Sequence, residues 1–107
     1  GIAGGFTGVR QIATLAAAHG VYIQPHNCGG PVSTAACVHL SFATPNFLIQ
    51  EIFPVWPEDD RLDMVDAPLE RTIVDGHVPL PNRPGLGVEL QADYLQRCEL
   101  LGEVQRG

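Results

Sequence analysis

The chain contains no lysine, and its six arginines are outnumbered by twelve acidic residues, which leaves a net charge of −6 over 107 residues. Nucleic acids and anionic membrane surfaces attract clustered positive charge, so this balance argues against either as a partner. No apolar run approaches the roughly 18 residues of a membrane-spanning helix, and no basic segment followed by an apolar one marks a secretory signal. We therefore expect a cytoplasmic protein no larger than one small domain.

Cysteine is also scarce. Cys28, Cys37 and Cys98 are odd in number, and their spacing fits neither a disulfide framework nor a zinc site. We expect three reduced thiols. A small metal-binding site built from His26, Cys28 and His39 stays open as a minor alternative, although spacing fixes no further ligand.

What the sequence does have is a hydrophobic content of 45%, enough for a packed core. Residues 7–19 carry apolar side chains at helix spacing, and residues 31–43 form a second expected helix with Pro31 in its first turn. The β-branched and aromatic segment 21–25 indicates a strand, and the apolar run 47–51 is typical of a strand buried on both faces of a parallel sheet. The order predicts one βαβ unit of an α/β fold.

Beyond residue 53 the sequence becomes rich in proline and aspartate, so we divide the chain into 1–53 and 54–107. The second part contains a predicted hairpin turn at Asp75-Gly76 and a predicted final helix over 92–104. A single βαβ unit leaves strand edges uncovered. We therefore expect that the chain either pairs with other chains or begins in the middle of something larger, as its glycine-rich start without methionine indicates.

Two polar residues follow the predicted strands, His26 after the first and Glu51 at the end of the second. Functional residues of parallel α/β sheets lie at the carboxyl ends of the strands, and adjacent strands lie ~4.8 Å apart. We expect both side chains in one pocket. The histidine can exchange a proton near neutral pH, and the glutamate can bind an oxyanion if protonated or fix the histidine if ionised. A helix-capping histidine and a solvated glutamate remain the alternative.

The other candidates carry weaker signals. His39 lies inside a predicted helix, where a packing role is favoured, and His19 lies in a last helical turn, where a positive charge suits the helix dipole. His77 follows a turn glycine and is expected to be exposed. Cys28 could be a nucleophile, but spacing provides no partner for it. Trp56 could line the pocket or simply pack.

The segments "AGGFTGVRQIATLAAAHGVYIQPHN" and "GGPVSTAACVHLSFATPNFLIQE" resemble the C-terminal part of the enolase superfamily barrel. They are most similar to its mandelate racemase and sugar-acid dehydratase branch. The tail "DGHVPLPNRPGLGVEL" is similar to that branch as well, so the resemblance covers nearly the whole chain.

The resemblance implies a modified (β/α)8 barrel with a separate capping domain. The strands ending at Pro25 and Glu51 would be its seventh and eighth, and the tail would return to the capping domain. His26 matches the general acid/base of an Asp–His dyad, and Glu51 matches the residue that hydrogen-bonds the substrate carboxylate or enediolate. We assign Asn27 and Trp56 to substrate binding.

The implied activity is that of a magnesium-dependent lyase, a hydro-lyase that abstracts the proton next to a carboxylate and eliminates water. "PHNCGGP" is most similar to enzymes acting on aldonic acids such as galactonate or gluconate. The partner is then a small sugar acid, and the complete enzyme is expected to be a homo-oligomer. A racemase or epimerase of the same superfamily is the closest alternative.

The resemblance also places essential residues outside these 107. The dyad aspartate belongs just before Gly1, and the carboxylate ligands of Mg²⁺ belong to earlier strands of a barrel of ~250 residues. We therefore expect no magnesium ligand here and no activity from the chain alone. The alternative from a different class is a non-catalytic α/β module that assembles with copies of itself or with a partner chain.

Overall fold

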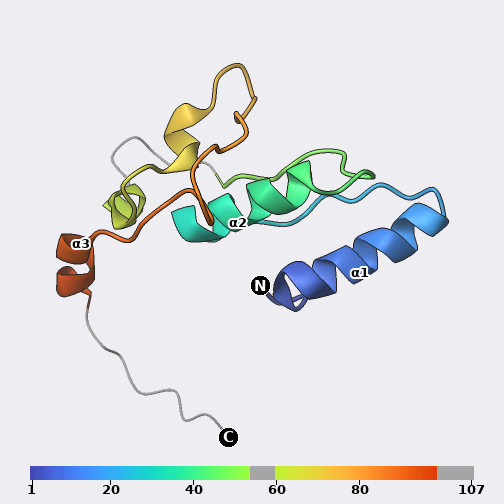
Figure 1. The fold of residues 1–107 in the computed structure, drawn as a ribbon, viewed down its shortest axis with the longest axis horizontal. Helices are drawn as coiled ribbons and strands as arrows, with labels where there is room; N and C mark the ends of the chain where they lie inside the picture. Colours follow the sequence, from blue (N-terminus) through green and yellow to red (C-terminus); the bar gives the residue numbers. More distant parts are fainter. Residues whose placement is uncertain (54–59, 99–107) are drawn as a thin grey trace, which may run out of the picture.

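The computed structural model describes residues 1–53 and 60–98. Its elements are three α-helices and two short 3-10 helices, in the order α1 (Gly5–Ala18), α2 (Pro31–Phe42), η1 (Asp60–Met64), η2 (Leu69–Thr72) and α3 (Ala92–Arg97). Figure 1 shows α1 projecting to one side and α2 in the middle. The segment 60–98, called the tail from here on, folds back over α2. None of the helices in these two ranges has the length and apolar character needed to cross a bilayer.

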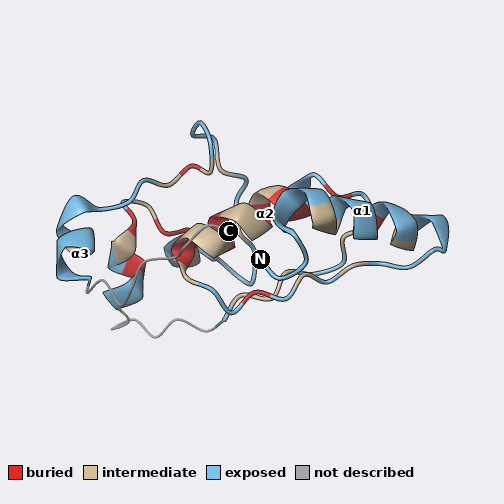
Figure 2. Cartoon of the chain, turned by 90° about the horizontal axis from the view of Figure 1, so that it is seen from below, coloured by how far each residue is buried: buried red, intermediate tan, exposed pale blue. Residues whose placement is uncertain are grey.

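Helix α1 confirms the predicted helix, and Gly20 takes the left-handed conformation after its last turn, with φ of 67°. Gly4, also left-handed, precedes its first residue and caps it without a side-chain hydrogen bond. Ala13 is its one buried residue, and Figure 2 shows α1 as the most exposed long helix. The contacts that hold α1 are therefore few.

Helix α2 begins at Pro31, as predicted, because the missing N–H of proline leaves nothing unpaired at that position. Its buried face runs through Pro31, Thr34, Ala35 and Val38. Figure 2 shows buried residues concentrated along this helix. Small polar residues share that face, so hydrophobic spacing alone does not locate it.

The hydrophobic core forms where the tail packs against α2. Ala35 and Val38 of α2 contact Leu69 of η2, and further apolar residues of the tail cover this cluster, namely Val78, Leu86 and Val88. This core joins residues on both sides of the predicted division between 1–53 and 54–107. The division itself, and the return of the tail to a capping domain, stay predictions.

A second set of contacts fastens the tail to itself. Arg83 donates to Oδ2 of Asp66 at 2.7 Å, and the backbone N–H of Glu89 donates to Oδ1 of the same carboxylate at 2.9 Å. An antiparallel bridge joins Val65 to Leu90 beside this pair. These contacts hold the two sides of the tail together across the loop that carries η2.

The two predicted strands are not formed as strands in the described residues, which corrects the expected α/β sheet. The segments 21–25 and 47–51 do run side by side in parallel, but they share a single bridge between Ile23 and Phe47. The Ile23 N–H donates to the Asn46 carbonyl at 2.8 Å, and the Leu48 N–H donates to the Ile23 carbonyl at 3.0 Å. Pairing stops there because Pro25 has no N–H to donate, and because an isolated parallel pair is marginal without further strands.

The predicted turn at Asp75-Gly76 is confirmed. Both residues have positive φ, 50° and 74°. Val74 and His77 exchange backbone hydrogen bonds of 3.0 and 2.9 Å, so the turn is a two-residue type I′ hairpin connection. Helix α3 confirms the start of the predicted final helix, but the helix ends at Arg97, and the backbone of Cys98 is already extended. The predicted continuation through Cys98 is therefore wrong, and residues 99–104 lie outside the described range.

Asn46 connects α1 to the parallel segments, and its removal should destabilise the fold. Its Nδ2 donates to the carbonyl of Ala13 at 3.0 Å and to that of Val21 at 2.9 Å. Asn46→Ala should lower the free energy of unfolding by about 1–3 kcal/mol, because two hydrogen bonds are lost. Urea titration followed by circular dichroism measures this change. Asn82→Ala, at an exposed position, is the control, and equal stability of the two variants would contradict the role of Asn46.

Candidate active site

The structure brings His26 and Glu51 into direct contact. Nδ1 of His26 lies 2.5 Å from Oε2 of Glu51, although 25 residues separate them in the sequence. Both residues follow the parallel pairing of Ile23 with Phe47, which sends the two segments in the same direction. The proximity predicted from the ends of neighbouring extended segments is therefore present, even though no full strand forms.

A backbone group completes this contact. The N–H of Asn27 donates to the same Oε2 of Glu51 at 3.1 Å. This bond, and next the one from His26, lowers the pKa of Glu51 from its ordinary value of 4.5. The carboxyl group is therefore ionised at neutral pH, the second of the two states considered for it above.

The ionised carboxylate determines how the imidazole carries its proton. A carboxylate only accepts hydrogen bonds, so Nδ1 of His26 must be the donor. In the neutral ring Nε2 then carries the lone pair, and the side chain is 73% exposed. The resemblance pairs this histidine with an aspartate, and in this chain Glu51 makes the carboxylate contact. The arrangement provides an accessible proton acceptor whose opposite nitrogen is fixed.

Asn27 follows His26 directly in the chain and is only 3% exposed. Its Oδ1 accepts from the Gly29 N–H at 3.3 Å and from Oγ of Ser33 at 2.9 Å, and its Nδ2 donates to Oγ1 of Thr34 at 3.1 Å. All these contacts are internal, so substrate binding by Asn27 stays a prediction. Sequence reasoning missed Ser33 and Thr34. The signal was an asparagine placed two residues before a glycine and ahead of a helix that begins with hydroxyl residues.

The two glycines between Asn27 and α2 differ in what they require. A Cβ on Gly29 would lie 2.5 Å from the Cβ of Ser33, so only glycine fits there. A Cβ on Gly30 would meet nothing within 4 Å, and its backbone is extended, with φ of −79°. The close return of this loop onto α2 therefore depends on Gly29.

The other histidines lie away from this pair. His39 is half-buried, and its Nε2 contacts the carbonyl oxygen of Leu86 at 3.1 Å, which fits the packing role favoured for it. His77 is exposed, as predicted, and its Nδ1 contacts the carbonyl of Asp75 at 2.8 Å. His19 is the exposed C-cap of α1. Trp56 lies outside the described residues, and its roles stay predictions.

Among the described residues, the cysteines do not form the metal site considered as an alternative in the sequence. All three cysteines are free, Cys28 and Cys98 exposed and Cys37 half-buried. Burial raises the pKa of Cys37. Within residues 1–53 and 60–98, no three side chains of histidine, cysteine, aspartate or glutamate gather closely enough to hold a metal ion. The described residues thus do not fit a magnesium site.

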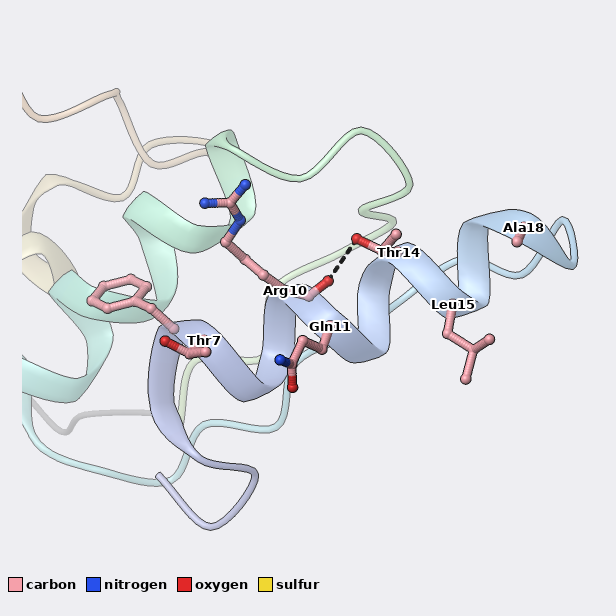
Figure 3. Close-up of a pocket in the computed structure, with 7 residues that line it drawn as sticks. Thr7, Arg10, Gln11, Thr14, Leu15 and Ala18 are labelled. Atoms are coloured by element: carbon pink, nitrogen blue, oxygen red, sulfur yellow. Dashed lines mark hydrogen bonds between the residues drawn. The ribbon is translucent and has the colours of Figure 1, made fainter.

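A shallow hollow lies along α1, separate from the histidine–glutamate pair (Figure 3). All its lining residues belong to that one helix, among them Thr7, Arg10, Gln11 and Leu15. The hydroxyl of Thr14 is bonded to the Arg10 carbonyl at 2.9 Å and so serves the helix itself. The hollow contains none of the predicted site residues.

Comparison with known proteins identifies the family. Residues 1–94 match the family described as "Enolase C-terminal domain-like". D-galactonate dehydratase of Xanthomonas campestris pv. campestris (strain B100) is 36% identical over 99 residues, which are 90% of this chain and 26% of that protein. D-galactonate dehydratase of Pectobacterium atrosepticum is 34% identical over 87% of this chain and 25% of its own length. The chain thus spans about a quarter of these curated relatives.

Solved structures give the same result. A solved structure from Burkholderia SAR-1, described as of the mandelate racemase/muconate lactonizing enzyme type, matches 94% of this chain and 25% of its own chain. The TM-score is 0.80 and the sequence identity is 40%. An enolase of the mandelate racemase subgroup from Agrobacterium tumefaciens matches 84% of this chain and 24% of its own, with a TM-score of 0.73 and 37% identity. The chain therefore belongs to the C-terminal domain of the enolase superfamily, in its mandelate racemase subgroup.

Proposed function

We propose that this chain supplies the acid/base histidine of a sugar-acid dehydratase, a hydro-lyase that acts on an aldonate. The observation that carries the proposal is the contact between Nδ1 of His26 and Oε2 of Glu51, fixed by the Asn27 N–H. The matched D-galactonate dehydratases support the reaction class and an aldonate substrate. We propose the dehydratase function for a complete enzyme that contains this chain, because the chain spans about a quarter of the matched relatives.

The chemistry follows from the state of the imidazole. Neutral His26 accepts at Nε2 the proton from the carbon next to the substrate carboxylate. The bond from the adjacent carbon to its hydroxyl group breaks, the imidazolium returns the proton to the departing oxygen, and water leaves. Glu51 remains ionised in this step and stabilises the imidazolium, so the ring ends in its starting tautomer. The hydrogen bond between Glu51 and the substrate carboxylate or enediolate, implied by the resemblance, stays a prediction.

Magnesium enters this proposal through the family, where it supplies charge stabilisation to an enediolate. The described residues form no site for it, so we assign the ligands to the remainder of the complete enzyme and route no step through the ion. A cytoplasmic location and a homo-oligomeric complete enzyme are part of the proposal. The same pair could serve a racemase or epimerase, which a product assay separates from a dehydratase.

A second candidate function is assembly through apolar surfaces, without catalysis. Large apolar side chains are exposed on α1, where Leu15 is 65% accessible, and on the two extended segments, where Tyr22 and Leu48 are accessible to a similar degree. Such surfaces are usually covered by other protein. Sedimentation of the purified chain tests this candidate. A species larger than the 11.5 kDa monomer supports it, and a stable monomer contradicts it.

His26→Asn in the complete enzyme should lower turnover of an aldonate by about 10²–10⁴-fold, the usual contribution of a general acid/base. Asparagine can still donate to Glu51 but offers no proton acceptor at the position of Nε2. Magnesium affinity should stay nearly unchanged. Steady-state kinetics and metal titration measure the two effects.

His77→Asn is the matched control, because His77 is an exposed histidine of the hairpin turn, and it should keep full activity. Loss of magnesium binding in His26→Asn would make His26 a ligand rather than an acid/base. Unchanged turnover in that variant would refute the proposed function.

The pKa of Glu51 gives a test in the 107-residue chain. Because the pKa of Glu51 is lowered in the folded chain, the ionised carboxylate stabilises the fold at pH values above 4.5, its ordinary pKa. This contribution to stability is lost as the pH falls through the lower pKa of the folded chain. His26→Ala should raise the carboxyl midpoint only part of the way toward 4.5, because the larger effect comes from the Asn27 N–H. Carbon-13 NMR of the side-chain carboxyl groups measures the midpoint.

Asp66 is the internal reference for this titration. Arg83 lowers its pKa from 3.8 in a separate part of the chain, so His26→Ala should leave the Asp66 midpoint in place. A Glu51 midpoint of 4.5 in the unsubstituted chain would show that the His26–Glu51 contact does not form in solution.

A further inference from the structure

We propose that Asn27 is the positioning residue of this site. Its side chain is anchored to helix α2, and the anchored residue holds both His26 and Glu51 in place. The inference rests on the proposed function, because it assigns a role beside the same acid/base pair. It differs from the substrate-binding role predicted for Asn27, since it requires no contact with substrate.

The side chain of Asn27 is anchored to helix α2. Thr34, which accepts from Nδ2 of Asn27, is 1% exposed and lies on the buried face of α2. Ser33, in the same helical turn, donates to Oδ1. The amide is therefore tied to two adjacent residues of a packed helix, a more rigid support than a loop provides.

The backbone of the anchored Asn27 contacts Glu51 and continues directly from His26. Its N–H donates to Oε2 of Glu51 at 3.1 Å, and its peptide bond joins it directly to His26. One fixed residue therefore sets the position of the carboxylate through a hydrogen bond and of the imidazole through the chain. The two side chains then meet, with Nδ1 of His26 lying 2.5 Å from Oε2 of Glu51.

Asn27 also stabilises the ionised form of Glu51. The Asn27 N–H is the largest cause of the lowered pKa of Glu51, and the ionised carboxylate holds the imidazole proton on Nδ1. A loop free to move would lose this N–H contact, and with it the preference for one tautomer. The side-chain amide of Asn27 therefore acts on Nε2 of His26 without touching it.

The test compares Asn27→Ala with Asn46→Ala in the 107-residue chain. Both remove an asparagine amide with internal hydrogen bonds, but Asn46 binds the carbonyls of Ala13 and Val21, away from the pair. Carbon-13 NMR reports the Glu51 midpoint and nitrogen-15 NMR reports the His26 tautomer. Asn27→Ala should move the Glu51 midpoint toward 4.5 and mix the two tautomers, whereas Asn46→Ala should change neither.

Milder variants keep the test decisive if Asn27→Ala does not fold. Thr34→Val preserves shape but removes the acceptor for Nδ2, and Ser33→Ala removes one donor to Oδ1. Each should shift the Glu51 midpoint in the same direction by a smaller amount. An unchanged midpoint and tautomer in the folded variants would overturn the proposal.

Kinetics of the complete enzyme separate positioning from substrate binding. A positioning role predicts that Asn27→Ala lowers kcat about tenfold or more with little change in KM, and that Asn27→Asp, which retains Oδ1, recovers part of the loss. A raised KM at unchanged kcat would replace positioning with substrate contact. The NMR measurements do not depend on catalysis, so they test the positioning role independently of the dehydratase assignment.

Discussion

The site depends on the backbone pairing at Ile23. Its N–H and carbonyl group both bond to the segment that follows α2, through Asn46 and Leu48, and they set the two extended segments parallel and in register. Because both segments then run in the same direction, the residues that follow the pairing lie side by side. His26 and Glu51 meet for this reason. Without the pairing, Asn27 would have no carboxylate within reach of its N–H.

The location of the pair was predictable from sequence because it follows from direction alone. Parallel segments place their ends together, whether or not a complete ladder forms between them. The type I′ turn at Asp75-Gly76 was predictable for a similar reason, since those residue types tolerate the positive φ that the turn requires. Local backbone preference and chain direction can thus be predicted from the residues of the segments alone, without knowledge of distant contacts.

What the sequence did not predict depends on contacts between distant residues. The β-branched and aromatic content of 21–25 and the apolar run 47–51 predicted strands, but a strand exists only through its neighbours. The described residues supply one bridge between these two segments. The buried face of α2 includes Thr34, which hydrophobicity does not mark. The role of Asn27 was hidden as well, because the same amide could face a substrate or a helix.

Membership of the enolase superfamily explains why the structure combines an ordered pair with an open surface. The chain spans about a quarter of the length of its relatives. Large apolar side chains are exposed on α1 and the two extended segments, and surfaces of this kind are usually covered by other protein. Within the described residues, the partners of the Asn27 side chain come from α2 and from the loop that precedes it.

The most direct test of the acid/base assignment is a crystal structure of the complete enzyme with a bound aldonate. Nε2 of His26 should lie within about 2.6–3.2 Å of the hydroxyl group that departs, the distance at which a general acid transfers a proton. A bound aldonate that leaves the His26 ring in solvent, out of reach of that hydroxyl group, would contradict it.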